Sequence, residues 1–84
     1  MHFRENADVL TSGGEKIGRI ERIVVDPATE EVTHLLISRG TFSKEKKLIP
    51  SMWVRDIFEN SVRLSVKNEV IENLPDPEST RRQA

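Results

Sequence analysis

The chain has 84 residues, contains no cysteine, and carries 13 Lys and Arg against 14 Asp and Glu. This length allows a single compact domain, and the lack of cysteine excludes disulfides, thiolate metal sites and thiol nucleophiles. Because the net charge is close to zero, no overall field attracts the protein to nucleic acid or to an anionic membrane. A core of this size supplies only a few kcal/mol, so we expect self-association to add stability.

The first third of the chain predicts two strands joined by a glycine turn. A short apolar segment at residues 7–10 precedes Gly13 and Gly14, and paired glycines supply the positive φ that tight hairpins need. Residues 17–25 match both helical and strand spacing, but β-branched residues dominate, Gly18 lies inside and a turn follows, which favours a strand. Its alternation is imperfect, so we expect this strand to bend or to contain a bulge.

The middle of the chain predicts a central strand and an edge strand. Asp26 and Pro27 form a turn, in which the Asp side chain is expected to bond the nearby backbone. Residues 32–39 are the most hydrophobic stretch and predict a central strand covered on both faces. Residues 44–49 begin with charged side chains, which are typical of an edge strand, and Pro50 interrupts the ladder after them.

The last third predicts a short strand near residues 52–58, a strand at 61–66 with one wet face, and a helix. Apolar residues four apart, Val66, Val70 and Leu74, give a helix of about two turns one apolar stripe, with Ile71 beside it. Pro75 ends this helix. Residues 76–84 lack large apolar side chains and predict a disordered tail, which leaves residues 1–75 as the domain.

No residue pattern predicts catalysis, a metal site or a cofactor. The only imidazoles are His2, near the terminus, and His34, which we interpret as a partly buried strand residue. Ser12 stands outside any nucleophile motif. The spacing of Gly13, Gly14 and Gly18 matches no phosphate-binding loop. These three glycines, with Asp26, Pro27 and Pro50, are therefore interpreted as structural turn residues.

Partner binding is predicted near the lysine-rich edge strand. Lys44, Lys46 and Lys47 form the densest positive region, and Phe42 and Trp53 offer surfaces on which nucleic acid bases stack. Glu45 breaks the run, so a solvated edge is favoured over a nucleic-acid site. Phe42 is apolar in a predicted loop tip, where it either caps the end of the barrel or fills a pocket of a partner, whereas Trp53 is favoured as a core residue.

The order of these features resembles the PRC-barrel domain family. The resemblance rests on residues 13–18 (GGEKIG), 24–27 (VVDP), 35–37 (LLI) and 48–50 (LIP), and it covers about residues 7–66. This family is named for the cytoplasmic domain of the photosynthetic reaction centre H subunit. It also includes the C-terminal domain of the ribosome maturation factor and many short stand-alone proteins.

The resemblance implies an all-β fold, a small and strongly bent antiparallel barrel of about five to six strands, here with a short C-terminal helix. It carries over no catalytic residue, so we expect a cytoplasmic, non-catalytic adaptor that docks a protein partner as a homodimer. One alternative is an RNA-associated accessory protein that uses the edge from Lys44 to Lys47. Another is a small ligand-binding or electron-transfer accessory domain. The longest apolar runs fall far short of the ~20 residues of a membrane helix, so no membrane insertion is expected.

Overall fold

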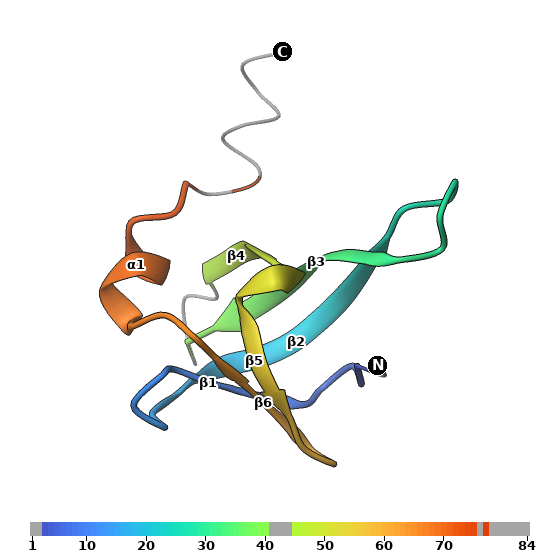
Figure 1. Cartoon of the computed structure of the whole chain (residues 1–84). Coiled ribbons are helices and arrows are strands. Elements are labelled where there is room, and N and C mark those ends of the chain that lie inside the picture. Colours follow the sequence, from blue (N-terminus) through green and yellow to red (C-terminus); the bar gives the residue numbers. More distant parts are fainter. Residues whose placement is uncertain (1–2, 41–44, 76, 78–84) are drawn as a thin grey trace.

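The computed structural model describes residues 3–40, 45–75 and 77, and these form one curled, six-stranded sheet with two short helical segments. The strands are β1 (Asp8–Leu10), β2 (Lys16–Val25), β3 (Val32–Arg39), β4 (Glu45–Pro50), β5 (Val54–Ile57) and β6 (Ser61–Leu64). A 3-10 turn, η1 (Ser51–Trp53), joins β4 to β5, and the helix α1 (Asn68–Glu72) follows β6. The sheet curls into a half-barrel with α1 beside it (Figure 1). The predicted all-β class with a strongly bent sheet and a short C-terminal helix is confirmed.

The strand order is β4-β3-β2-β1-β6-β5. All neighbouring pairs are antiparallel except β1 and β6, which run parallel with Asp8 opposite Ser61 and Val9 opposite Val62. This pair differs from the expected antiparallel barrel because its two strands are not joined by a hairpin. A parallel pair needs a long crossover connection, which here is everything from β2 to β5. The pair joins the β2–β3–β4 sheet to the β5–β6 hairpin.

The turn at Gly13 and Gly14 joins β1 to β2, as predicted. Gly14 has a φ of +88°, a conformation that costs glycine nothing and strains other residues. Its N–H donates to the carbonyl of Thr11 at 3.0 Å. The buried Thr11 hydroxyl accepts from the N–H of Glu15 at 3.2 Å, so the turn also satisfies its one buried side-chain oxygen.

Gly18 lies inside β2 and not in a turn, so its interpretation as a turn residue is wrong. A Cβ added there would overlap the carbonyl oxygen of Ser38 and lie 2.9 Å from Cγ2 of Ile37, both on β3. The missing side chain thus allows the close approach of β2 and β3. Packing, and not backbone conformation, requires glycine at this position.

The predicted bend in β2 is confirmed by two shifts in its register with β3, between Ile20 and Arg22 and between Val24 and Val25. The first shift inserts Glu21 as an extra residue. Ile20 and Ile23 therefore pair with the two buried residues of β3 although their numbers differ in parity. This bulge explains the imperfect alternation in the sequence.

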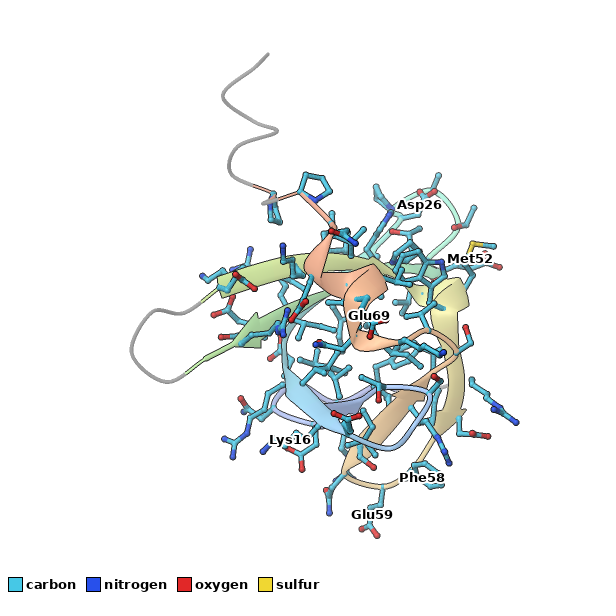
Figure 2. All side chains as sticks on the ribbon, turned by 90° about the vertical axis from the view of Figure 1, so that its left-hand side faces the viewer. Lys16, Asp26, Met52, Phe58, Glu59 and Glu69 are labelled. Atoms are coloured by element: carbon cyan, nitrogen blue, oxygen red, sulfur yellow. The ribbon has the colours of Figure 1, made fainter. Side chains whose placement is uncertain are left out.

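Two cross-strand rows of side chains form the centre of the core. The register aligns Ile23, Leu35 and Ile49 in one row and Ile20, Ile37 and Lys47 in the next. The buried apolar residues are Ala7, Val9, Ile20, Leu35, Ile37, Ile49, Val62, Leu64 and Ile71. They come from five of the six strands, the segment before β1, and α1, whose ribbon lies over the interior of the curled sheet (Figure 2). The helix therefore closes the core on the side that the sheet leaves open.

The helix is shorter than predicted, and it buries a different residue. It covers only residues 68–72, so Val66 precedes it and Leu74 follows it. Ile71 is completely buried, whereas Val70 is 42% exposed. The predicted stripe of Val66, Val70 and Leu74 is wrong because these residues span nine positions, whereas the helix has only five residues.

The turn at Asp26 behaves as predicted, whereas Pro50, predicted to interrupt the ladder, still pairs with His34 on β3. Oδ1 of Asp26 accepts from the N–H of Ala28 at 2.8 Å, which is the expected bond to its own turn, with Pro27 between them. Pro50 is the last residue of β4, and η1 begins directly after it. Except for Pro77, the predicted tail at residues 76–84 lies outside the described residues, and the domain boundary at residue 75 stays a prediction.

Candidate interaction surface

Strands β2, β3 and β4 carry two further rows of paired residues on the side opposite the core. The register aligns Arg22 with Leu36 and Leu48, and Val24 with His34 and Pro50. Residues directly opposite each other in antiparallel strands have Cβ atoms about 4.5–5.5 Å apart, so these six side chains form one continuous patch. We call these six residues the outer face.

The outer face lines an open groove of about 700 Å³. The other residues that line it are Glu21, Lys46, Trp53, Leu74, Pro75 and Pro77. Most of the lining residues are apolar, and Leu48 among them is 37% exposed. On a small domain, a largely apolar hollow that none of the described elements covers is typical of a binding surface.

A second hollow of about 660 Å³ lies along the first half of β2. Its lining includes Asn6, Lys16, Arg19 and Glu21, whose polar and charged side chains are well solvated in water. Two of these side chains are already engaged, because Lys16 and Arg19 both pair with Asp8. The apolar groove is therefore the stronger candidate for binding.

The two cationic side chains at the groove, Lys46 and Arg22, differ in whether they have an acidic partner. Lys46 pairs with Glu21 at 3.1 Å, so that cation is partly neutralised. Arg22 is exposed and forms no ion pair within residues 3–40, 45–75 and 77. His34 is half-buried, and its Nδ1 lies 3.0 Å from Oγ1 of Thr33. Arg22 thus offers an uncompensated guanidinium at the edge of an apolar patch.

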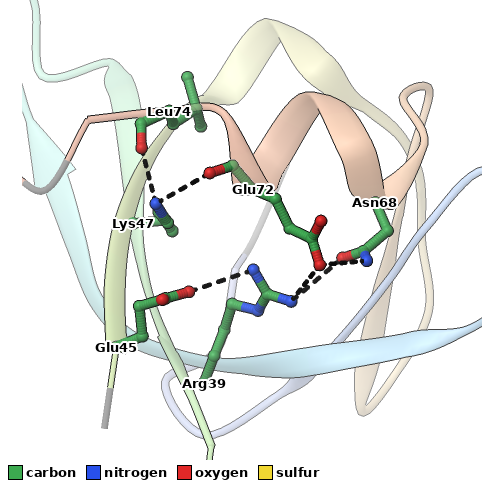
Figure 3. Close-up of polar contacts among 6 residues, drawn as sticks. All are labelled: Arg39, Glu45, Lys47, Asn68, Glu72 and Leu74. Carbon is green, nitrogen blue, oxygen red and sulfur yellow. Dashed lines mark hydrogen bonds and ion pairs between the residues drawn. The ribbon is translucent and has the colours of Figure 1, made fainter.

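Lys47 points to the other side of β4, where it holds the end of α1. It is 6% exposed, and its ammonium donates to the carbonyl of Leu74 at 2.6 Å and to that of Glu72 at 3.4 Å (Figure 3). The last carbonyls of a helix have no partner within the helix, and a cation that reaches them satisfies them. The prediction that Lys47 contacts a partner is therefore corrected, because this side chain belongs to the interior.

Arg39 on β3 holds the same helix from a neighbouring position (Figure 3). Its guanidinium donates to Oδ1 of Asn68 at 3.1 Å and to Glu45 at 3.3 Å, and it lies 3.8 Å from Oε1 of Glu72. The side chain is mostly buried, with 17% of its surface exposed. Two basic residues from β3 and β4 thus fasten α1 over the core.

A family model for the PRC-barrel domain matches residues 5–71, which extend from just before β1 into α1. The chain belongs to the PRC-barrel domain family. PRC-barrel domains are in general non-catalytic interaction domains. No curated protein sequence matches the chain.

Only part of the predicted partner-binding set lies at the groove of this PRC-barrel domain. Lys46 and Trp53 line the groove, and Trp53 also packs against the core. Phe42 and Lys44 lie outside the described residues. The predicted cluster of lysines is therefore divided by the alternation of β4, which places Lys46 and Lys47 on opposite sides of the sheet.

The sequence interpretation missed the outer-face residues Arg22, Leu36 and Leu48. Three consecutive apolar residues in β3 were interpreted as a strand covered on both faces, yet Leu36 is only half-buried and faces the groove. The alternation of Lys46 and Leu48 with Lys47 and Ile49 was the available signal. It predicts that one side of the edge strand remains without a covering layer.

Within residues 3–40, 45–75 and 77 of this PRC-barrel domain, no group of three or more His, Asp or Glu side chains is placed to hold a metal ion. Over the same residues, no helix has the length and apolar character needed to span a bilayer.

Proposed function

We propose that this PRC-barrel domain is a cytoplasmic, non-catalytic docking module that binds a protein partner through the groove over its outer face. The observation that carries the proposal is the groove itself, whose mostly apolar lining includes the exposed Leu48. Membership of a family of interaction domains agrees with it. The small core also supports self-association to a homodimer as part of this function.

The chemistry of the groove restricts the kind of partner segment that fits. Leu36, Leu48 and Trp53 suit aliphatic or aromatic side chains, which gain free energy when they leave water. Arg22, exposed and without an ion pair among the described residues, suits a carboxylate, which it can bind with two parallel hydrogen bonds. The preferred partner segment therefore combines a large apolar side chain with an acidic one.

The two alternative functions have less support. An RNA-associated role was expected to use Lys44, Lys46 and Lys47, but Lys46 is paired with Glu21 and Lys47 is internal. A phosphate contact by either lysine would compete with an interaction that already exists. For a ligand-binding or electron-transfer accessory role, the open groove lacks the enclosure with which small-molecule sites bury most of a ligand.

The test is capture of partners from a lysate of the source cells on three immobilised proteins: the wild type, Leu48→Glu and Val70→Glu. Both substitutions place a carboxylate at an exposed aliphatic position, but Val70 lies on α1 and not at the groove. We expect the wild type and Val70→Glu to retain the same proteins, and Leu48→Glu to lose them. Retention by Leu48→Glu, or loss of the proteins after ribonuclease treatment, would contradict the proposal, and the second outcome would favour the RNA alternative.

A further inference from the structure

The turn between β5 and β6 carries an exposed aromatic side chain next to an acidic one. Phe58 is 53% exposed, and Glu59 and Asn60 beside it are also exposed. The N–H of Phe58 donates to the carbonyl of Ser61 at 2.8 Å, which fixes the turn. Figure 2 shows Phe58 and Glu59 at the tip of this hairpin, where they project away from the rest of the molecule.

The turn and the groove are complementary in chemistry. Within the part of the chain that the structure describes, Glu59 forms no ion pair, and neither does Arg22 at the groove. Phe58 and Glu59 are consecutive residues of the turn, and Arg22 and Leu36 are direct cross-strand partners at the groove. An exposed apolar and acidic pair on the turn thus has a counterpart in an apolar and basic pair at the groove.

We propose that the groove of one copy binds the β5–β6 turn of a second copy, with Phe58 against Leu36 and Leu48 and with Glu59 paired to Arg22. This inference rests on the proposed function, because it names a second copy as an occupant of the same groove. The turn projects from the molecule and the groove is open, so the turn is accessible to the groove of a second copy. The paired charges fix the orientation of the turn in the groove.

The positions of the two surfaces determine the kind of assembly. In Figure 1 the coloured segment directly after α1 lies at the end of the molecule opposite the tip of the β5–β6 hairpin, and Leu74 and Pro75 of that segment line the groove. A contact between two different surfaces at opposite ends is head-to-tail, so a pair of copies keeps one free groove and one free turn. The smallest assembly is therefore a dimer, and further copies add to it as the concentration rises.

Another exposed apolar residue with an acidic neighbour is Val70, next to Glu69 on α1. Val70 is smaller than Phe58. It lies on the exposed side of α1, and α1 itself is held against the sheet, so Val70 does not project from the molecule as the β5–β6 turn does. Met52 is more exposed, at 83%, but its neighbours Ser51 and Trp53 carry no charge to pair with Arg22. Val70 therefore serves as the matched control position.

The experiment measures the mass in solution by sedimentation equilibrium for the wild type, Arg22→Glu, Phe58→Glu and Val70→Glu. We expect the mass of the wild type and of Val70→Glu to rise with concentration. Arg22→Glu disables the groove, Phe58→Glu disables the turn, and each should weaken association by roughly tenfold or more. Circular dichroism confirms that every variant remains folded.

The decisive sample is an equimolar mixture of Arg22→Glu and Phe58→Glu. The first variant keeps an intact turn and the second an intact groove, so the mixture should form a pair of twice the 9.6 kDa chain mass and grow no further. A wild type that stays monomeric up to a concentration of roughly 1 mM overturns the proposal. Association that is unchanged in both variants, or a mixture that stays monomeric, overturns it as well. In each of these cases the capture experiment with Leu48→Glu still decides the proposed function independently.

Discussion

The ammonium group of Lys47 lies 2.6 Å from the carbonyl oxygen of Leu74, so the edge strand β4 is joined directly to the end of α1. This contact explains why a lysine occupies the end of the core row formed with Ile20 and Ile37. An aliphatic residue at position 47 would bury more apolar surface but would leave the end of the helix without a donor. The lysine packs its stem as an apolar residue does and neutralises the helix end with its charge.

Replacing Lys47 with Met tests this contact, because Met keeps the apolar stem and removes the ammonium. We expect the free energy of unfolding to fall by about 1–3 kcal/mol, since a charge-assisted hydrogen bond contributes about that amount. Urea denaturation followed by circular dichroism measures it. Lys46→Met is the matched control, because the Lys46 side chain is 42% exposed, and it should change stability by less than about 0.5 kcal/mol. Equal effects of the two substitutions would show that the Leu74 contact contributes nothing.

Gly18 and Gly13 respond differently to the same substitution. At Gly18 an added Cβ overlaps the backbone oxygen of Ser38, so Gly18→Ala should lower the unfolding free energy by about 2 kcal/mol or more. At Gly13 the nearest atom to an added Cβ is Oγ1 of Thr11, 3.8 Å away, so Gly13→Ala should be nearly neutral. Thermal denaturation of the two variants side by side measures the difference. A Gly18→Ala variant as stable as Gly13→Ala would mean that β2 and β3 are further apart than described.

The buried face of α1 is tested at two neighbouring positions. Ile71 is completely buried in the core, and Ile71→Ala should destabilise the domain by about 2–5 kcal/mol through lost packing and a residual cavity. Val70 is 42% exposed, and Val70→Ala should cost less than about 1 kcal/mol. Chemical denaturation of both variants measures the loss in unfolding free energy and shows which of the two side chains packs into the core. A larger effect at Val70 than at Ile71 would restore the helical stripe predicted from the sequence.

Local signals in the sequence predicted most of the fold. Paired glycines predicted the hairpin at Gly13 and Gly14, and the Asp26–Pro27 stop marked the end of β2. Both depend on backbone conformation over a few residues, which sequence determines directly. The predicted helix was too long because the apolar spacing of Val66, Val70 and Leu74 was followed past Asn73, which is the C-cap of α1. Tertiary contacts from Lys47 and Arg39 determine where α1 lies.

The candidate site was predicted less well than the fold because it depends on the register between strands. Nothing local places Arg22 next to Leu36, since the Glu21 bulge shifts the pairing of β2 by one residue. Without that shift, Arg22 would point toward the core side. Lys46 and Lys47 were grouped by their adjacency in sequence, whereas a strand separates neighbouring side chains onto opposite faces.

The fluorescence of Trp53 provides a further test of the contact between copies. Trp53 is the only tryptophan of the chain and lines the groove, so its emission reports how much water reaches that surface. We expect the emission maximum to shift to shorter wavelength as the protein concentration increases, because Phe58 of a second copy displaces water there. Arg22→Glu should abolish the shift, and the double variant Arg22→Glu, Glu59→Arg should restore it, since exchanging the two charges recreates the pair. A shift that persists in Arg22→Glu, or a double variant that behaves as the single one, would place the contact elsewhere on the molecule.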